Sequence, residues 1–249
     1  MSRTGLILTA HQPVYLPWLG LLHKIALADA FVWFDDVQYQ DKDWNNRNRV
    51  KTAAGPVWLT VPVFNKNHYA LKLKDVLIRN DMPWRRKHWK TIALSYAKAP
   101  YASRYLPFFE DLYRQEWKKL SEFNEHMLKF LLAQLGIQVA FSRLSEMELQ
   151  SKKSSLVLEM CQRLQPDVYL FGAQGRTYAD EAAFHDAGIR LEFQDYLHPT
   201  YRQQHGPFVS HLSVIDLLFN HGPDSLEIIM SGNLSKKQLI ERHVAFERA

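Results

Sequence analysis

LILTAHQPVYLPWLGLLHKIALADAFVWFDD, residues 6–36, is the stretch of sequence that decides the fold. It contains two compact apolar runs, 6–10 and 31–35, without polar alternation, which is typical of strands buried on both faces. The residues between the runs are helix formers with no breaker after Gly20. A strand, a helix and a second strand at this spacing form a β-α-β unit. The stretch therefore predicts the start of a parallel sheet.

The rest of the chain continues this alternation around a helical segment. A strand at 57–63 is expected near a sheet edge, because Pro62 has no backbone N–H to donate. Residues 83–136 read as three helices with Pro or Gly at their borders, and strands and helices then alternate again. We predict a single α/β domain over residues 1–249, with a mostly parallel, Rossmann-like three-layer sheet and a helical insertion at about 83–136.

The composition is that of a globular protein of a reducing compartment. Hydrophobic residues make up 47% and charged residues 23%, and the one cysteine, Cys161, has no partner for an internal disulfide. The apolar run at 6–10 is too short for a signal peptide, and no run reaches the ~18 residues of a membrane span. We therefore expect a cytoplasmic protein. The net charge of +5 favours anionic partners, with plain solubility as the alternative reason for it.

Polar residues follow three of the predicted strands at the point where each strand ends. His11 and Gln12 follow the first strand, Asp36 follows the second, and GAQGR, residues 172–176, follows a later one. Ligands of open parallel sheets bind beyond the carboxyl ends of the strands, so we expect these groups to line one site. His11 has the chemistry of a general base or of a phosphate ligand. The alternative is a neutral imidazole bound to a backbone carbonyl.

A basic, amide-rich stretch at 39–55 is the next candidate for binding. Its cations, amides and tryptophan suit a nucleotide or nucleotide-sugar pocket, and the alternative is a solvated hairpin or loop. Two aromatic residues between the first strand and its helix could stack on a base or sugar ring, or pack in the core. The predicted binding residues of these two segments are Tyr15, Trp18, Lys42, Trp44, Asn46, Arg47 and Arg49.

The GAQGR segment has the features of an anion-binding turn. Gly172 and Gly175 let backbone N–H groups approach an anion, and the helix that follows favours negative charge at its N-terminus. Arg176 could neutralise a phosphate or pair with Asp180 one turn later. The pattern is neither a dinucleotide-binding fingerprint nor a Walker loop, so it indicates an anion without naming one.

A long polar loop at 195–208 is expected to cover the site. His198 and Tyr201 are its predicted binding residues, since long loops that carry such side chains are often functional. Asp195, His198 and His205 are metal-ligand types, but their spacing matches no zinc pattern. No metal site is predicted.

Four blocks of the chain carry a family resemblance. The sequence resembles the WbqC family in HQPVYLPWLGLLHKIALADAFVWFDDVQYQDKDWNNRNRVKT, YLFGAQGRTYAD, DYLHPTYRQ and LSVIDLLFNHG. This family is linked to bacterial surface-polysaccharide (O-antigen) gene clusters, and the resemblance covers nearly the whole chain. It implies sugar modification or nucleotide-sugar processing.

A second resemblance concerns layout alone. TAHQPVYLPWLG and QPDVYLFG are similar to nucleotidylyltransferases, which have a strand ending at a His-containing turn, a Gly at a helix start and a later PDVxxxG strand. The second histidine that this family places beside the glycine is missing, since Trp18 and Leu19 precede Gly20 and His23 comes three residues later. The similarity supports a nucleotide-shaped pocket more than nucleotidyl transfer.

The leading hypothesis is an enzyme of surface-polysaccharide biosynthesis that modifies a nucleotide-activated sugar by acyl or aminoacyl transfer. His11 would be the acid/base, oriented by Asp36 or by Asp216, an acid among the apolar residues of a predicted helix. Phosphates would be held by Arg47, Arg49 and Arg176, and the sugar or base by Gln12, Trp44 and Asn46. The alternatives are a nucleotidylyltransferase-like enzyme and a non-catalytic partner of glycan assembly. Nucleic acid is not an expected partner, and the sequence identifies neither cofactor nor oligomeric state.

Overall fold

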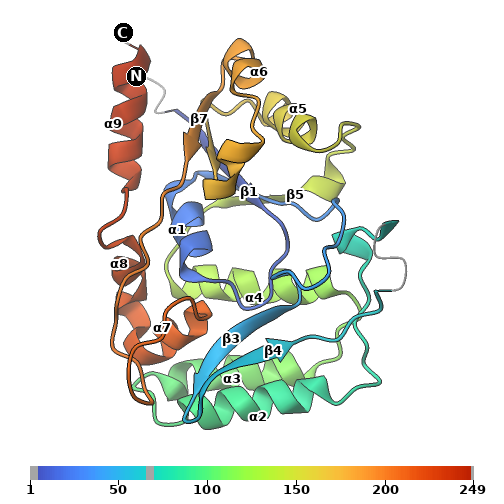
Figure 1. The fold of residues 1–249 in the computed structure, drawn as a ribbon, viewed down its shortest axis with the longest axis vertical. Coiled ribbons are helices and arrows are strands. Elements are labelled where there is room, and N and C mark those ends of the chain that lie inside the picture. The colour runs from blue at the N-terminus through green and yellow to red at the C-terminus, as the bar shows by residue number, and fades with distance from the viewer. Residues whose placement is uncertain (1–4, 66–69, 248–249) are drawn as a thin grey trace.

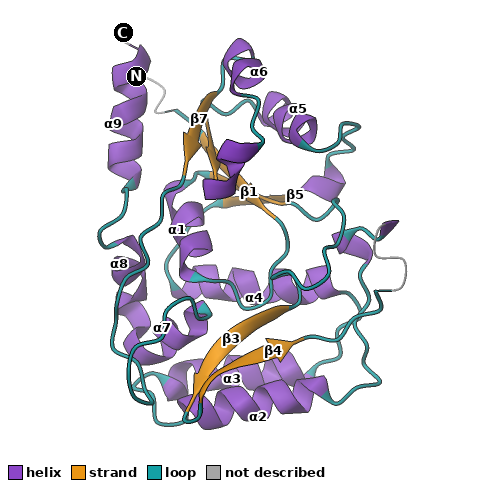
Figure 2. Ribbon diagram, viewed as in Figure 1, coloured by secondary structure: helices purple, strands orange, loops and turns teal. Residues whose placement is uncertain are grey.

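The computed structural model describes residues 5–65 and 70–247, and its centre is a five-stranded sheet (Figures 1 and 2). The sheet has the order β5-β2-β1-β6-β7, and every neighbouring pair in it is parallel. Its strands are β1 Ile7–His11, β2 Ala30–Trp33, β5 Ala140–Arg143, β6 Val168–Phe171 and β7 Arg190–Phe193. The predicted α/β class with a mostly parallel sheet is confirmed.

The opening stretch forms the β-α-β unit that its pattern predicts. β1 pairs with β2 in a register that puts Leu8 opposite Ala30 and His11 opposite Trp33. The first four residues of β1 are buried, which explains why this strand is apolar throughout instead of alternating. The strand ends at His11, whose side chain is half-buried.

Helices cover both faces of the sheet. On one face Val32 packs with Met160 of α5 and Phe184 of α6. On the other, Ile7 packs with Leu239 of α9. The α-helices are α1 Leu19–Leu27, α2 Trp84–Tyr96, α3 Ala102–Arg114, α4 Leu120–Gln134, α5 Ser154–Leu164, α6 Glu181–Asp186, α7 Val214–His221, α8 Ser225–Met230 and α9 Lys236–Glu247. In the described parts of the chain, no helix combines the length and apolar character needed to span a bilayer.

The helical insertion contains the three expected helices, α2, α3 and α4. Together with α7 they surround a hairpin below the main sheet in Figure 1. One cluster of buried apolar residues runs from β2 through these helices, with Phe31, Phe109 and Phe219 among its members. The single-domain organisation stays a prediction.

The strand predicted at 57–63 does not belong to the main sheet. Its residues form β4 Gly55–Thr60, which pairs antiparallel with β3 Arg47–Thr52 in a separate two-stranded sheet. β3 was not predicted from the sequence, because the polar side chains of this strand interrupt the apolar pattern that indicates a strand. Asn48 and Lys51 are nevertheless buried, since Asn48 donates to the Leu16 carbonyl and Lys51 Nζ donates to the Pro207 carbonyl.

The order of the strands fixes where a ligand can bind. From β1 the chain proceeds to β2 and β5 on one side, and later to β6 and β7 on the other. The direction therefore reverses between β1 and β6. In open α/β sheets, the crevice beyond the carboxyl ends of two such strands is the usual ligand site.

Candidate functional site

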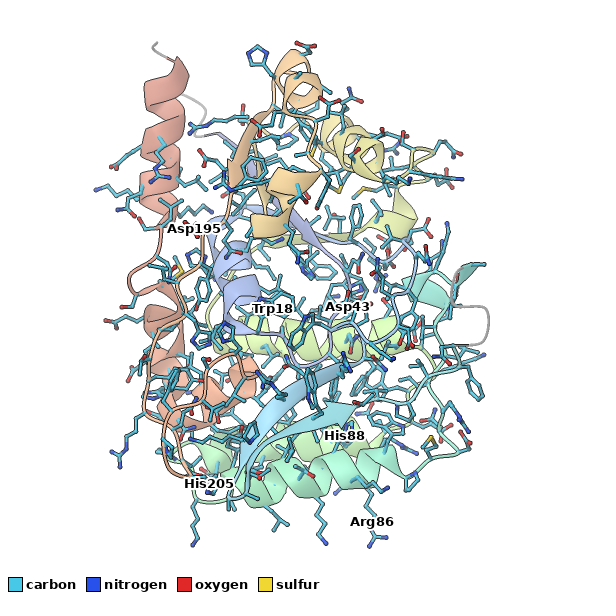
Figure 3. All side chains as sticks on the ribbon, viewed as in Figure 1. Trp18, Asp43, Arg86, His88, Asp195 and His205 are labelled. Carbon is cyan, nitrogen blue, oxygen red and sulfur yellow. The ribbon has the colours of Figure 1, made fainter. Side chains whose placement is uncertain are left out.

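A cavity of about 770 Å³ opens at this reversal point, beyond the ends of β1 and β6. Its wall includes His11 and Gln12 from the end of β1 and Gly172 and Gly175 from the end of β6. Trp18, Asp43 and Asp195, which come from three separate connections, also line it and are labelled in Figure 3. The volume lies in the range of roughly 300–1,000 Å³ that is usual for small-molecule sites.

His11 stands in the cavity wall as a neutral imidazole. Its Nδ1 lies 2.8 Å from the Gln12 carbonyl oxygen, which can only accept, so the proton sits on Nδ1 and Nε2 keeps its lone pair. Burial, with a further contribution from the nearby Lys24 charge, lowers the pKa of His11 to about 3. The Trp18 ring packs edge-on against the imidazole, with the two ring centroids 5.3 Å apart. His11 thus keeps an unprotonated Nε2, which can accept a hydrogen bond or a proton.

Lys24 is a cavity residue that the sequence analysis did not single out. It lies on α1, is only 3% exposed, and its Nζ donates to the Ala10 carbonyl at 2.9 Å. Burial lowers its pKa to about 7. Among residues 5–65 and 70–247, no carboxylate forms an ion pair with it, and it is the one lysine or arginine in the cavity wall. The available signal was a lone lysine among the apolar positions of LGLLHKIAL.

The end of β6 contributes backbone to the wall. Gly175 is buried, and a Cβ built on it would lie 2.5 Å from the Cβ of Phe171, so only glycine fits there. Arg176 does not belong to the wall: it is exposed, and its guanidinium lies over the Phe193 ring at 4.8 Å. The backbone of this segment lines the cavity, whereas its cation does not.

The aromatic and amide groups divide between the cavity and the core. Trp18 and Trp44 line the cavity. Tyr15 does not, because its buried hydroxyl bonds to Nδ1 of His88 at 2.9 Å and to the Tyr113 hydroxyl. Asn46 is buried and donates to the Val61 carbonyl at 2.8 Å. Its neighbour Asn45, which the sequence did not single out, reaches the wall instead.

Three of the predicted cations lie outside the cavity wall. Arg47 and Arg49 extend from β3 over the Trp58 ring, with Cζ at 4.8 and 5.6 Å from its centroid. Lys42 is exposed, and its carbonyl accepts a hydrogen bond from Arg47. These three cations therefore lie outside the cavity wall.

The long polar loop brings His198 to the cavity but leaves Tyr201 in the core. His198 Nδ1 lies 2.8 Å from the Pro199 carbonyl, and its Nε2 accepts from the His211 N–H at 3.2 Å. Burial lowers its pKa. Tyr201 is 6% exposed and donates its hydroxyl to Asp216 at 3.1 Å.

Neither predicted orienting acid is the partner of His11. Asp36 forms ion pairs with Lys72 at 2.9 Å and Lys74 at 2.8 Å. Asp216, 1% exposed, accepts from the hydroxyls of Tyr96 and Tyr201. The imidazole is oriented instead by the Gln12 carbonyl.

We expect Asp216→Ala to lower the free energy of unfolding by about 2–4 kcal/mol, because it leaves two buried hydroxyls without their acceptor. Asp216→Asn should cost less, since the amide still accepts one hydrogen bond. Urea denaturation measures both, with Asp186→Ala, an exposed aspartate on α6, as the control. A variant as stable as wild type that loses turnover would return Asp216 to the catalytic machinery.

His23 occupies no position in the cavity wall. It is buried, with Nε2 bonded to the Leu234 carbonyl at 3.0 Å and Nδ1 to the Gln194 amide at 2.8 Å. It therefore does not replace the second histidine of nucleotidylyltransferases. Within the described residues there is no group of three His, Cys, Asp or Glu side chains that could hold a metal ion.

Comparison with known proteins places the chain in a family. A protein of Mycobacterium tuberculosis (strain ATCC 25618 / H37Rv), "Uncharacterized protein Rv1507c", is 33% identical over 216 residues, which is 86% of this chain and 93% of that protein. No solved structure matches the chain significantly. The profile of the WbqC-like protein family matches residues 12–228, which include His11's neighbour Gln12, Lys24 and the end of β6. The chain belongs to the WbqC-like protein family.

Proposed function

We propose that the protein is a transferase that modifies a nucleotide-activated sugar in surface-polysaccharide biosynthesis. The observation that carries the proposal is the cavity at the reversal point of the sheet, with a proton-accepting histidine and a buried lysine in one wall. Membership of the WbqC-like family supports the link to polysaccharide biosynthesis. The cytoplasm, where nucleotide sugars are made, is the proposed location.

The phosphates of the ligand would lie between Lys24 and the backbone of Gly172 and Gly175. A phosphate oxygen beside Lys24 supplies the negative charge that its ammonium lacks in the free protein. A Cβ built on Gly172 would meet nothing within 4 Å, so the space beside its backbone is open to a ligand. Gln12 and Trp18 would orient the sugar or base.

The transfer step uses His11 as its base. A sugar hydroxyl or amino group would lose its proton to Nε2 as it attacks the acyl carbon of the donor. The bond from the acyl carbon to the leaving group then breaks, and the imidazolium returns the proton to that group. The Gln12 carbonyl keeps the ring oriented throughout and stabilises the transient positive charge.

The two alternatives differ in what they require. Nucleotidylyltransferases place a second histidine beside the glycine that opens the helix; in this chain that histidine is missing, and His23 is bonded elsewhere. A non-catalytic partner protein needs an exposed apolar patch in place of a polar cavity, whereas His11, Lys24, Gln12 and Asp195 line this one. We therefore retain acyl or aminoacyl transfer to a nucleotide-activated sugar as the proposal.

A thermal-shift screen against nucleotides, nucleotide sugars and acyl-CoA tests this function. A nucleotide sugar at a hundred times its dissociation constant should stabilise the protein by about 2.7 kcal/mol. The same ligand at the same concentration should stabilise Lys24→Met by no more than about half as much. If no nucleotide or nucleotide sugar shifts the melting temperature of the wild type, the proposal is wrong.

A further inference from the structure

A row of three tryptophans leads from the cavity to the surface of the hairpin. Trp18, beside His11, lies 5.8 Å from Trp44, and Trp44 lies 5.6 Å from Trp58 on β4. Trp18 and Trp44 line the cavity, and Trp58 does not. Trp44 is 36% exposed and Trp58 49% exposed. We call Trp18, Trp44 and Trp58 the tryptophan row.

Two arginines cover the outer end of the tryptophan row. Arg49 stands directly opposite Trp58 in the hairpin register, and Arg47 is two residues away on the same strand. Apart from contacts with the Trp58 ring, Arg47 donates to the Lys42 carbonyl and Arg49 to the His211 carbonyl. Neither guanidinium takes part in an ion pair within the described residues.

The acids nearest in sequence do not neutralise these arginines. Asp41 accepts a hydrogen bond from Asn65, and Asp43 accepts one from the Trp44 backbone N–H. A second exposed arginine–aromatic pair in the protein, Arg79 over Phe64, is different, because Arg79 is neutralised by Asp81 at 2.8 Å. Arg47 and Arg49 are thus available to bind the anionic group of a ligand.

The partly exposed indoles of Trp44 and Trp58, beside two such arginines, suit one kind of ligand. Base and sugar rings stack on tryptophan, and guanidinium groups bind phosphate through paired N–H donors. A ligand that joins a flat ring to a phosphate would use both. Because the row continues into the cavity, a group attached to such a ligand could reach His11.

We propose that Trp44, Trp58, Arg47 and Arg49 bind the second substrate of the transfer, a phosphate ester that carries a ring with a flat face. This inference rests on the proposed function, in which the cavity holds the activated sugar. The ring stacks on the indoles, the phosphate binds the arginines, and the group to be transferred extends past Trp18. The ring belongs to a nucleobase or to a pyranose.

The test is isothermal titration with adenosine 5′-monophosphate, glucose 1-phosphate and inorganic phosphate. Trp58→Leu should weaken the binding of a ring-bearing ester at least tenfold and leave inorganic phosphate unchanged. The double variant Arg47→Gln/Arg49→Gln should weaken all three ligands. Phe64→Leu, at a side chain that is 55% exposed, is the matched control and should bind as the wild type does. If Trp58→Leu weakens the binding of adenosine 5′-monophosphate alone, the ring is a nucleobase. If it weakens the binding of glucose 1-phosphate alone, the ring is a pyranose.

Lys24→Met separates this surface from the cavity. A ligand held by the tryptophan row keeps its affinity in that variant, whereas a ligand held in the cavity loses affinity. Binding at the tryptophan row can therefore be measured even if the proposed function of the cavity is wrong. The inference is overturned if neither ester binds, or if Trp58→Leu binds both like the wild type. It is equally overturned if sedimentation velocity finds a dimer that Trp58→Leu dissociates, since the surface then joins two copies.

Discussion

Lys24→Met is expected to stabilise the folded protein at pH 7 and at the same time to weaken at least tenfold the binding of phosphate-bearing ligands in the cavity. The side chain is buried with one carbonyl as its partner, so its charge costs free energy until an anion arrives. Methionine has a similar length and carries no charge. Stability and binding should therefore change in opposite directions, as they do when a group is retained for function.

The pH dependence gives the size of the stabilisation. The pKa of Lys24 is lowered from 10.5 to about 7, so between these values the unfolded chain binds more protons than the folded one. Stability of the wild type therefore rises with pH in this window, by about 2 kcal/mol from pH 7 to 9. At pH 7 the variant should gain up to about 4 kcal/mol, and it should lack the slope.

Urea denaturation at pH 7, 8 and 9 measures both effects. Lys87→Met, at an exposed lysine of α2, is the matched control and should keep the slope of the wild type. Titration with inorganic pyrophosphate in the Arg47→Gln/Arg49→Gln background, which removes the arginine surface, measures the binding to the cavity. A Lys24→Met protein that is less stable than the wild type at pH 7, or that binds pyrophosphate equally well, would remove Lys24 from the site.

His11→Asn is expected to lower the turnover of the transfer reaction by about 10²–10⁴-fold, the usual contribution of a general base. Asparagine can still donate to the Gln12 carbonyl, but it has no nitrogen that accepts a proton. Binding of the nucleotide sugar should stay within about threefold, because the phosphate contacts are made elsewhere. Single-turnover kinetics with the ligands found by thermal shift measure the rate.

The pH profile distinguishes a catalytic from a structural histidine. The pKa of His11 is about 3, so its Nε2 stays unprotonated and the rate should show no acid limb near pH 6.5 that belongs to it. His185→Asn, at an exposed histidine of α6, is the control and should leave the rate unchanged. Full turnover in a folded His11→Asn protein would refute the assignment of the base.

Part of the site could be predicted because it depends on where strands end. His11, Gln12, Gly172 and Gly175 follow apolar runs, and parallel strands bring such positions to one edge. The separate position of β3 and β4 could not be predicted in this way. Asn48 and Lys51 look exposed in the sequence, and the carbonyls that satisfy them lie 32 and 156 residues away.

Partners that are distant in sequence also explain why two predicted site residues lie in the core. Tyr15 looked available for stacking, yet His88 and Tyr113 bind its hydroxyl in the core. Asp216 looked able to orient a catalytic group, yet two tyrosines occupy its carboxylate. Polarity shows that a side chain needs partners, and only packing shows which partners it has.

The sequence by itself determined the parallel sheet and the edge of it that carries the cavity, because apolar runs and breakers act within a few residues of the backbone. Only the tertiary structure decided which side chains share that cavity. Burial lowered the pKa of the Lys24 amine to about 7, and packing over Trp58 placed Arg47 and Arg49 outside the cavity wall. The charge state of a group depends on the solvent and charges that surround it in space, and folding alone sets these.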